Sequence, residues 1–246
     1  MNVARQELTG LVTDIVACSA VDGPGNRYVV FLQGCQFDCL ACHNPCTIPE
    51  HPPWLAPTTV TDLVADIRGA APFLSGVTVT GGEATGQADF VRALFDALAA
   101  DPETQTLTRF VDSNGDADPG VWDLLAPVTD GVMVDLKALD PQMHLVLTGA
   151  DNARVLAGCR KLAASGLLYE VRLLLIPGLN DADEVLAETA RWLLELDPHL
   201  RVRVNAYRAT GVRPCGRDLL EPGPDELARY RRILMDSGVT RLTLVG

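Results

Sequence analysis

The chain has 246 residues, of which 48% are hydrophobic and 21% are charged, and its mean hydropathy is +0.14. This length suits one α/β domain with a sizeable core and is too short for a second full domain. The formal net charge of −12 argues against a nucleic-acid partner, because such proteins usually present a basic surface.

The sequence predicts strands and helices in alternation after an N-terminal extension over residues 1–26, in which residues 8–18 form a short strand or hairpin. Strands are predicted at 27–33, 76–80, 108–112, 131–136, 169–176, 201–206 and 241–245, and helices at 61–71, 88–100, 119–126, 141–147, 152–165, 182–196 and 225–237. Five prolines over residues 45–58 predict a surface loop. Alternating strands and helices favour a parallel sheet covered by helices, in a single domain over 1–246 whose main part is 27–246.

No apolar run reaches the roughly 18 residues that span a bilayer, and the polar first residues are not typical of a signal peptide. We therefore expect a cytoplasmic protein without a membrane partner. In that compartment thiols stay reduced, so the seven cysteines are expected to bind metal or remain free rather than form disulfides.

Four cysteines lie within residues 35–46, directly after the first main strand. Cys35, Cys39 and Cys42 follow the spacing Cys-x3-Cys-x2-Cys, and Cys46 comes next. Thiolates this close together bind zinc or an iron–sulfur cluster. A single loop favours the cluster, because structural zinc sites usually gather two separated pairs of ligands. A zinc site, a redox or structural cysteine cluster, and a ligand role for Cys46 stay open.

The strings around these cysteines resemble those of one enzyme family. They are Asp-Gly-Pro-Gly at 22–25, Phe-Leu-Gln-Gly-Cys at 31–35 and Cys-His-Asn-Pro at 42–45. With the cysteine spacing, they are similar to the glycyl-radical-enzyme activating enzymes of the radical S-adenosylmethionine (SAM) superfamily, which are typified by pyruvate formate-lyase activating enzyme. The resemblance implies an open, partial (β/α)6 TIM-type barrel and a [4Fe–4S] cluster on the first three cysteines, with SAM bound at the fourth iron.

The resemblance also implies an activity. A flavodoxin or ferredoxin supplies one electron, SAM is cleaved to methionine and a 5′-deoxyadenosyl radical, and this radical removes a hydrogen atom from a glycine of a partner glycyl-radical enzyme. The protein orients the cofactor and excludes water and oxygen. Two alternatives stay open: a radical SAM enzyme that acts on a small molecule or a peptide, and a non-catalytic metal-binding or scaffold protein.

Further candidate residues follow the predicted strands, at the ends where a parallel barrel carries its functional loops. Gly81, Gly82 and Glu83 resemble the family's Gly-Gly-Glu string, which implies a contact with the SAM amino group. The Asp-Ser-Asn-Gly string at 112–115 is similar to the family's Asp-Thr-Asn-Gly. Each string could also be an ordinary turn.

The resemblance implies a monovalent cation near SAM, held by Asp112, Ser113, Asp135 and the backbone of Met133. Two carboxylates at neighbouring strand ends suit a hard cation. The same string at 112–115 makes Asn114 a further candidate for SAM binding.

Lys137 ends the string Asp135-Leu136-Lys137, which resembles the family's Asp-Leu-Lys and implies a contact of Asp135, Leu136 and Lys137 with SAM; a solvated end charge is the alternative for Lys137. Arg172 interrupts an apolar strand, so it must be paired or line a cavity. The resemblance places it on the SAM side, and Lys137 and Arg172 are the candidate catalytic residues.

Ala41, Cys42, His43 and Arg208 complete the candidate SAM-binding set. Ala41 stands where the superfamily often has an aromatic residue, so its backbone can contact adenine but ring stacking is lost. Arg208 replaces a histidine and can still reach a carboxylate or a ribose hydroxyl. The chain lacks a further cysteine-rich insert, which predicts a single cluster.

Overall fold

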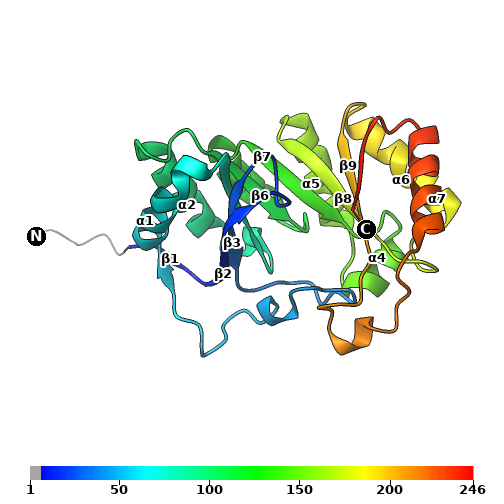
Figure 1. Cartoon of the computed structure of the whole chain (residues 1–246), viewed down its shortest axis with the longest axis horizontal. Coiled ribbons are helices and arrows are strands. Elements are labelled where there is room, and N and C mark those ends of the chain that lie inside the picture. Colours follow the sequence, from blue (N-terminus) through cyan, green and yellow to red (C-terminus); the bar gives the residue numbers. More distant parts are fainter. Residues whose placement is uncertain (1–6, 246) are drawn as a thin grey trace, which may run out of the picture. The chain divides into compact units, whose positions relative to one another are not determined.

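A computed structural model describes residues 7–245, so the first six residues of the expected N-terminal extension lie outside the described residues (Figure 1). The chain divides into two compact units. Unit 1 contains the chain up to Cys35 together with Thr47–Asp112 and Gly120–Gly131, and unit 2 contains Gln36–Cys46, Ser113–Pro119 and Val132 onward. The domain boundaries expected from the sequence stay a prediction.

Unit 1 is built on strands in the order β2-β3-β5-β6, in which β2 is antiparallel to β3 and the other neighbours are parallel. Helices α1 and α2 lie side by side in this unit (Figure 1). The strands are β2 Val12–Ser19, β3 Arg27–Leu32, β5 Gly76–Gly81 and β6 Thr108–Ser113, and the helices are α1 Val60–Ala70, α2 Ala88–Ala100 and α3 Pro119–Leu125.

A two-stranded sheet stands apart from this order. Strand β1, Thr9–Gly10, pairs antiparallel with β4, Thr58–Thr59. The prediction of a surface loop over residues 45–58 is therefore wrong at its last residue, because Thr58, which follows the last proline, pairs with Gly10 in a strand. A 3₁₀ turn at Pro45–Thr47 also interrupts that loop, while the proline-rich remainder has no regular ladder.

Unit 2 is built on four parallel strands in the order β7-β8-β9-β10. They are β7 Gly131–Leu136, β8 Leu168–Leu175, β9 Arg201–Ala206 and β10 Arg241–Val245, and the helices are α4 Pro141–Thr148, α5 Ala153–Ala164, α6 Asp183–Leu196 and α7 Pro224–Asp236. The α/β class with a mostly parallel sheet, expected from the alternation of elements, is confirmed. No helix within residues 7–245 is long and apolar enough to cross a bilayer.

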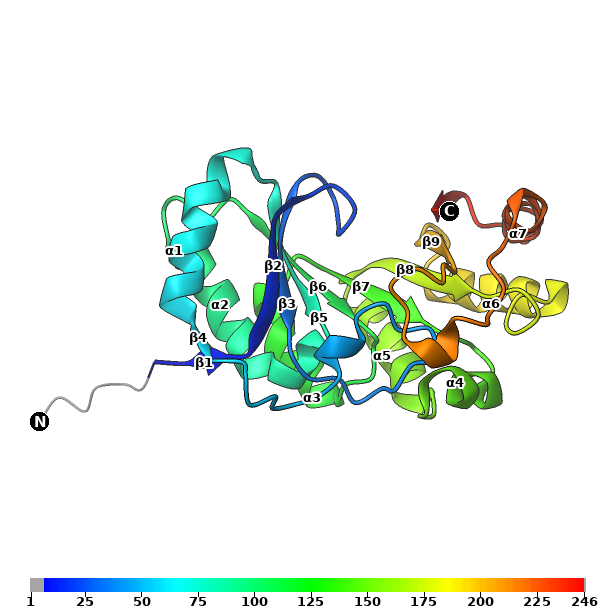
Figure 2. The same cartoon turned by 60° about the horizontal axis from the view of Figure 1, so that its bottom comes forward.

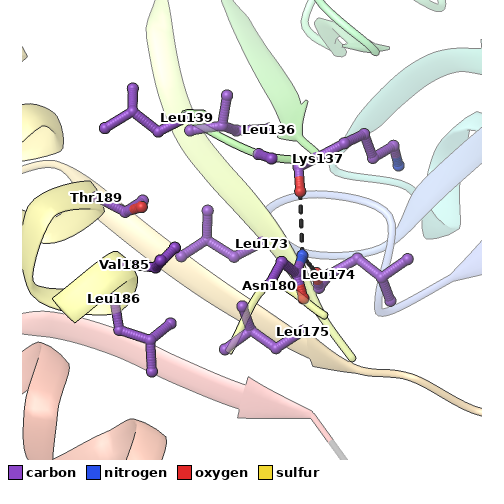
Figure 3. Close-up of a pocket in the computed structure, with 11 residues that line it drawn as sticks. Leu136, Lys137, Leu139, Leu173, Leu174, Leu175, Asn180, Val185, Leu186 and Thr189 are labelled. Atoms are coloured by element: carbon purple, nitrogen blue, oxygen red, sulfur yellow. Dashed lines mark hydrogen bonds between the residues drawn. The ribbon is translucent and has the colours of Figure 1, made fainter. Parts of the chain in front are cut away.

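The strands of unit 2 have two different faces, since successive side chains of a strand point to opposite sides. The apolar face carries Leu136, Leu173 and Leu175, which line a pocket with residues of α6 (Figure 3). On the charged face, the strand register sets Arg172 of β8 opposite Asp135 of β7 and Arg203 of β9. We define the charged face as these three residues with Lys137 and Glu170.

Helix α4 has clear signals at both ends. Asp140 is its N-cap and accepts a hydrogen bond from the backbone N–H of Met143, and Pro141 occupies the first turn, where the missing donor costs nothing. Gly149 ends the helix with a φ of +80°, a conformation that glycine adopts without steric cost. These signals fix where the helix ends, and that end positions the cysteine loop.

Candidate active site

The cysteine loop, residues 36–46, is anchored on the C-terminal end of α4 (Figure 2). The backbone N–H of Asp38 donates to Thr148 O at 2.9 Å, and that of Leu40 donates to Leu147 O at 2.8 Å. The last carbonyls of a helix have no partner within the helix, so the loop satisfies groups that would otherwise need water. Cys39 is therefore held between two anchored residues.

His144 stabilises this end of α4 from inside. Its side chain is fully buried, its Nδ1 lies 2.9 Å from Ala150 O, and its ring meets Phe37 of the cysteine loop edge-on at 5.4 Å between centroids. Burial lowers the pKa of His144, so the imidazole is neutral and Nδ1 carries the proton that the carbonyl accepts. No local pattern in the sequence marks His144, because a lone histidine on an apolar helix face carries no signal.

The segment after β9 also contacts the cysteine loop, and we call residues 207–216 the brace. Arg213 donates hydrogen bonds to the carboxylate and carbonyl of Asp38 and, at 2.6 Å, to the carbonyl of Cys39. His43 Nε2 lies 2.9 Å from Arg208 O, and because a carbonyl only accepts, Nε2 is the donor. The contact of Arg213 with Asp38 could not be predicted from the sequence, because it joins residues about 175 positions apart.

Gly216 gives the brace its closest approach to the loop. A Cβ atom at this position would lie 2.5 Å from Leu40 O and 2.4 Å from a methyl carbon of Val212, so no larger residue fits without movement. The Tyr207 hydroxyl donates to Gly216 O. Ala41 is buried in an apolar cluster with Tyr207 and Val212, so its methyl group is part of the packing between loop and brace.

Two cations of unit 2 act on the thiols. Burial raises the pKa of both Cys39 and Cys42, while the positive charges of Lys137 and Arg213 lower it for each. Thiolate is the form that binds metal. The positive charges of Lys137 and Arg213 therefore partly offset the free-energy cost of forming buried thiolates at Cys39 and Cys42.

The charged face forms a connected network next to these thiols. Lys137 Nζ lies 2.7 Å from Asp135 Oδ2, and Arg172 pairs with Glu170 at 2.9 Å while another of its nitrogens contacts the sulfur of Met133. Burial acts to raise the pKa of Asp135, but Lys137 and Arg172 outweigh it, so this pKa lies below its ordinary value and the carboxylate is ionised. Arg172 is thus paired, as its place in an apolar strand required.

Asn180 fixes the backbone where Lys137 leaves β7 (Figure 3). Its amide donates to Lys137 O at 3.1 Å and to Leu174 O at 2.7 Å, and its oxygen accepts from the N–H of Ile176 at 2.9 Å. Lys137 gives its carbonyl to this contact while its side chain points away from the pocket. Leu136 lines the pocket and so lies on the apolar face, away from Asp135 and Lys137.

Unit 1 holds the other part of the predicted set, Cys35 with the Gly-Gly-Glu string and Asp112. Gly81 has a φ of +123°, and a Cβ atom on Gly82 would lie 2.2 Å from Gly34 O, so both positions require glycine. The N–H of Glu83 donates to that same carbonyl at 2.8 Å. The string is therefore packed against the backbone that leads into Cys35.

The carboxylate of Glu83 is buried and has local partners. Its Oε1 accepts from the backbone N–H and the hydroxyl of Thr85 at 2.9 and 2.7 Å, as an N-cap of the following 3₁₀ turn. Asp112 accepts a 3.4 Å hydrogen bond from the Thr80 hydroxyl. Both carboxylates stay predicted ligands, for the SAM amino group and for a cation respectively.

Ser113 and Asn114 form the turn that their residue types favour. Ser113 Oγ accepts from the N–H of Gly115 and Asn114 Oδ1 from that of Asp116, each at 2.9 Å. Gln36 of the cysteine loop donates to Asn114 Oδ1 at 3.2 Å. This turn therefore also touches the loop, and its predicted contact with SAM stays a prediction.

Cysteine thiolates are the usual protein ligands of iron–sulfur clusters, so the chemistry of the loop's donors fits a cluster. In a cubane each cysteine binds a different iron. Arg213 Nε is buried and has no hydrogen-bond partner among the described residues. This donor next to the loop is therefore available to a bound group.

Comparison with known proteins decides the family. Residues 29–190 match the Radical SAM superfamily. The pyruvate formate-lyase-activating enzyme of Streptococcus mutans is 35% identical over 215 residues, which cover 85% of this chain and 81% of that protein. The pyruvate formate-lyase 1-activating enzyme of Escherichia coli K12 is 33% identical over 248 residues, which cover 92% and 98%. The chain belongs to the pyruvate formate-lyase-activating enzymes of the radical SAM superfamily.

Solved structures of radical SAM proteins share the fold. A radical SAM methyltransferase from Sphaerobacter thermophilus superposes with a TM-score of 0.69 at 20% identity, over 97% of this chain and 77% of that one. A domain of a pyruvate-formate lyase-activating enzyme from Bacteroides vulgatus gives a TM-score of 0.58 at 25% identity, over 70% and 99%. The neighbours are TIM-like partial barrels, which confirms the expected fold class, and as a member of this family the chain is a radical SAM enzyme.

Proposed function

We propose that this radical SAM enzyme activates a glycyl-radical enzyme by removing a hydrogen atom from a glycine of that partner protein. Cys35, Cys39 and Cys42 would hold a [4Fe–4S] cluster, which when bound supplies the electron that cleaves SAM. The observation that carries the proposal is that the anchored loop with Cys39 and Cys42 shares one unit with Lys137 and Arg213, whose charges act on both thiols.

The charged face is the proposed site for the methionine part of SAM. Lys137 and Arg172 offer cationic donors for a carboxylate, and Glu83 would take the amino group. Asn114, Asp135, Leu136, His43 and Arg208 complete the proposed set, together with the backbone around Ala41. A monovalent cation at Asp112, Ser113 and Asp135 would have to compete with the Lys137 ammonium, which already lies 2.7 Å from Asp135.

The relatives' names refer to pyruvate formate-lyase, and a glycyl-radical enzyme of this kind is the proposed protein substrate. A flavodoxin or ferredoxin would supply the electron, and the cytoplasm would keep the seven cysteines reduced. The alternatives with a small-molecule or peptide substrate predict SAM cleavage without a stored radical in a partner enzyme.

The test is anaerobic reconstitution with iron and sulfide, reduction with dithionite in the presence of SAM, and quantification of 5′-deoxyadenosine. We expect product from the wild type and none from Cys39→Ala, while Cys159→Ala, which removes a buried thiol outside the loop, should behave as the wild type. Adding the glycyl-radical enzyme encoded in the same genome should give a glycyl radical signal in electron paramagnetic resonance. SAM cleavage without that signal would overturn the activase proposal, and a bound cluster that never cleaves SAM would leave a metal-binding protein.

A further inference from the structure

We propose that the brace is the device that holds the cluster-binding loop in its ligating conformation, and that Arg213 is its positioning residue. This inference rests on the proposed function, because it concerns the loop that would bind the cluster. No motif of the sequence marks Arg213.

Both the backbone N–H groups and the backbone carbonyls of the loop around Cys39 form hydrogen bonds with other parts of unit 2. Its N–H groups at Asp38 and Leu40 donate to the carbonyls that end α4. Its carbonyls at Asp38 and Cys39 accept from the guanidinium of Arg213. A short irregular loop whose N–H and carbonyl groups both bond to tertiary partners has one preferred conformation, because a change of conformation breaks several hydrogen bonds at once.

Arg213 suits this task better than a lysine would. Its planar guanidinium presents donors in a fixed arrangement, and one of its terminal nitrogens contacts two successive carbonyls while the other meets the Asp38 carboxylate. The side chain is only 20% exposed, so these contacts are partly shielded from water. The ammonium group of a lysine would keep the positive charge but could not form these hydrogen bonds to the carboxylate and both carbonyls at the same time.

The charge of Arg213 has a second consequence. Its guanidinium donates to the carbonyl of Cys39 at 2.6 Å, so a positive charge is fixed directly beside the loop. The reduction potential of an iron–sulfur cluster depends on nearby charge and on hydrogen bonds to its sulfur atoms. A fixed cation beside the loop would raise that potential and make the bound cluster easier to reduce.

Other residues of the brace also contact the cysteine loop. Gly216 lets the segment approach Leu40 O closely, and Tyr207 binds Gly216 O. His43, which follows Cys42, is tied to the backbone of Arg208. The brace therefore contacts the loop before Cys39, between Cys39 and Cys42, and after Cys42, so movement of one contact strains the others.

The first test uses the metal-free protein and hydrogen–deuterium exchange of residues 36–46. In Arg213→Gln and Arg213→Lys the amides of Asp38 and Leu40 should exchange about tenfold faster than in the wild type, because loss of the Arg213 hydrogen bonds lowers the free energy needed to open the loop locally. Arg232→Gln, which changes an exposed arginine of α7, should not alter the exchange. Gly216→Ala should also speed exchange at Leu40 while Arg213 stays intact.

The second test uses the reconstituted protein. Arg213→Gln should lose iron to a chelator about tenfold faster than the wild type and should have a more negative midpoint potential in an electron paramagnetic resonance titration. Arg213→Lys should lose iron faster yet keep a potential close to that of the wild type. Unchanged amide exchange together with an unchanged potential in Arg213→Gln would overturn the inference. A wild type that binds no cluster would instead overturn the proposed function, and the exchange test of the brace would still stand.

Discussion

The two faces of the unit 2 strands differ although the same backbone produces them. On the apolar face, Leu173 and Leu175 are buried and pack towards α6. On the charged face, alternating positions of the same strand carry Glu170 and Arg172, which pair with each other. The comparison shows how one strand can stabilise the fold with one side and serve a site with the other, because neighbouring side chains point in opposite directions.

The largest effect should come from the apolar face. Leu173→Ala removes a buried side chain and leaves a cavity, so the free energy of unfolding should fall by about 3 kcal/mol. The cluster content and SAM cleavage of the folded protein should stay near the wild-type values. Chemical denaturation measures the change, and Leu220→Ala, at a side chain that is 65% exposed, is the control. If fully folded Leu173→Ala protein failed to cleave SAM, the apolar face would also serve the active site, and the proposed division of roles between the two faces would be wrong.

The charged face should show the opposite pattern. Lys137→Met should lower the rate of SAM cleavage about 100-fold, the size expected when a preorganised charge is removed from an active site. Its pair with Asp135 is partly exposed, so the free energy of unfolding should change by less than about 1 kcal/mol.

The chain's other lysine provides the control for this variant. Lys161→Met changes a residue of α5 and should cleave SAM at the wild-type rate. Rates of 5′-deoxyadenosine formation and denaturation curves for both variants check the prediction. A Lys137→Met enzyme with full activity would remove the charged face from the proposed SAM site.

The effect that is smallest at neutral pH concerns the buried thiol of Cys159. Burial raises the pKa of Cys159, on α5, from its ordinary 9.0 to about 12. Between these values the folded protein keeps a proton that the unfolded chain loses, so stability is full below pH 9 and falls as the pH rises towards 12, by at most about 1.4 kcal/mol per pH unit.

Two measurements check this behaviour. Native protein at pH 8 should be alkylated at the exposed Cys18 while Cys159 reacts only on unfolding. The stability difference between the wild type and Cys159→Ala should shrink as the pH rises above 9. Equal labelling of both cysteines in the native state would show that α5 does not shield the apolar layer.

Much of the candidate site could be predicted from local patterns. The spacing of Cys35, Cys39 and Cys42 and the strings around them led to the family that the comparisons then showed. The single charge inside an otherwise apolar strand singled out Arg172. Proline and glycine at the ends of α4 set its limits. Each of these signals lies within a few residues of chain, and a sequence shows such signals directly.

Other parts depended on contacts between distant segments. Thr58 lies in a strand because it pairs with the distant Gly10. The side chain of Asn180 donates to the carbonyl of Lys137, which is 43 positions away in the sequence. The donors of Arg213 reach Asp38 and Cys39, and His144 supports the helix end that anchors them.

The sequence by itself determined the order of strands and helices, the family and the residue types that can bind a cluster and SAM. The tertiary structure alone decided which backbone carbonyls hold the cysteine loop and which cations act on its thiols. The physical reason is that hydrogen bonds and charge act over a few ångströms in space, and only folding brings Arg213 within that reach of Cys39.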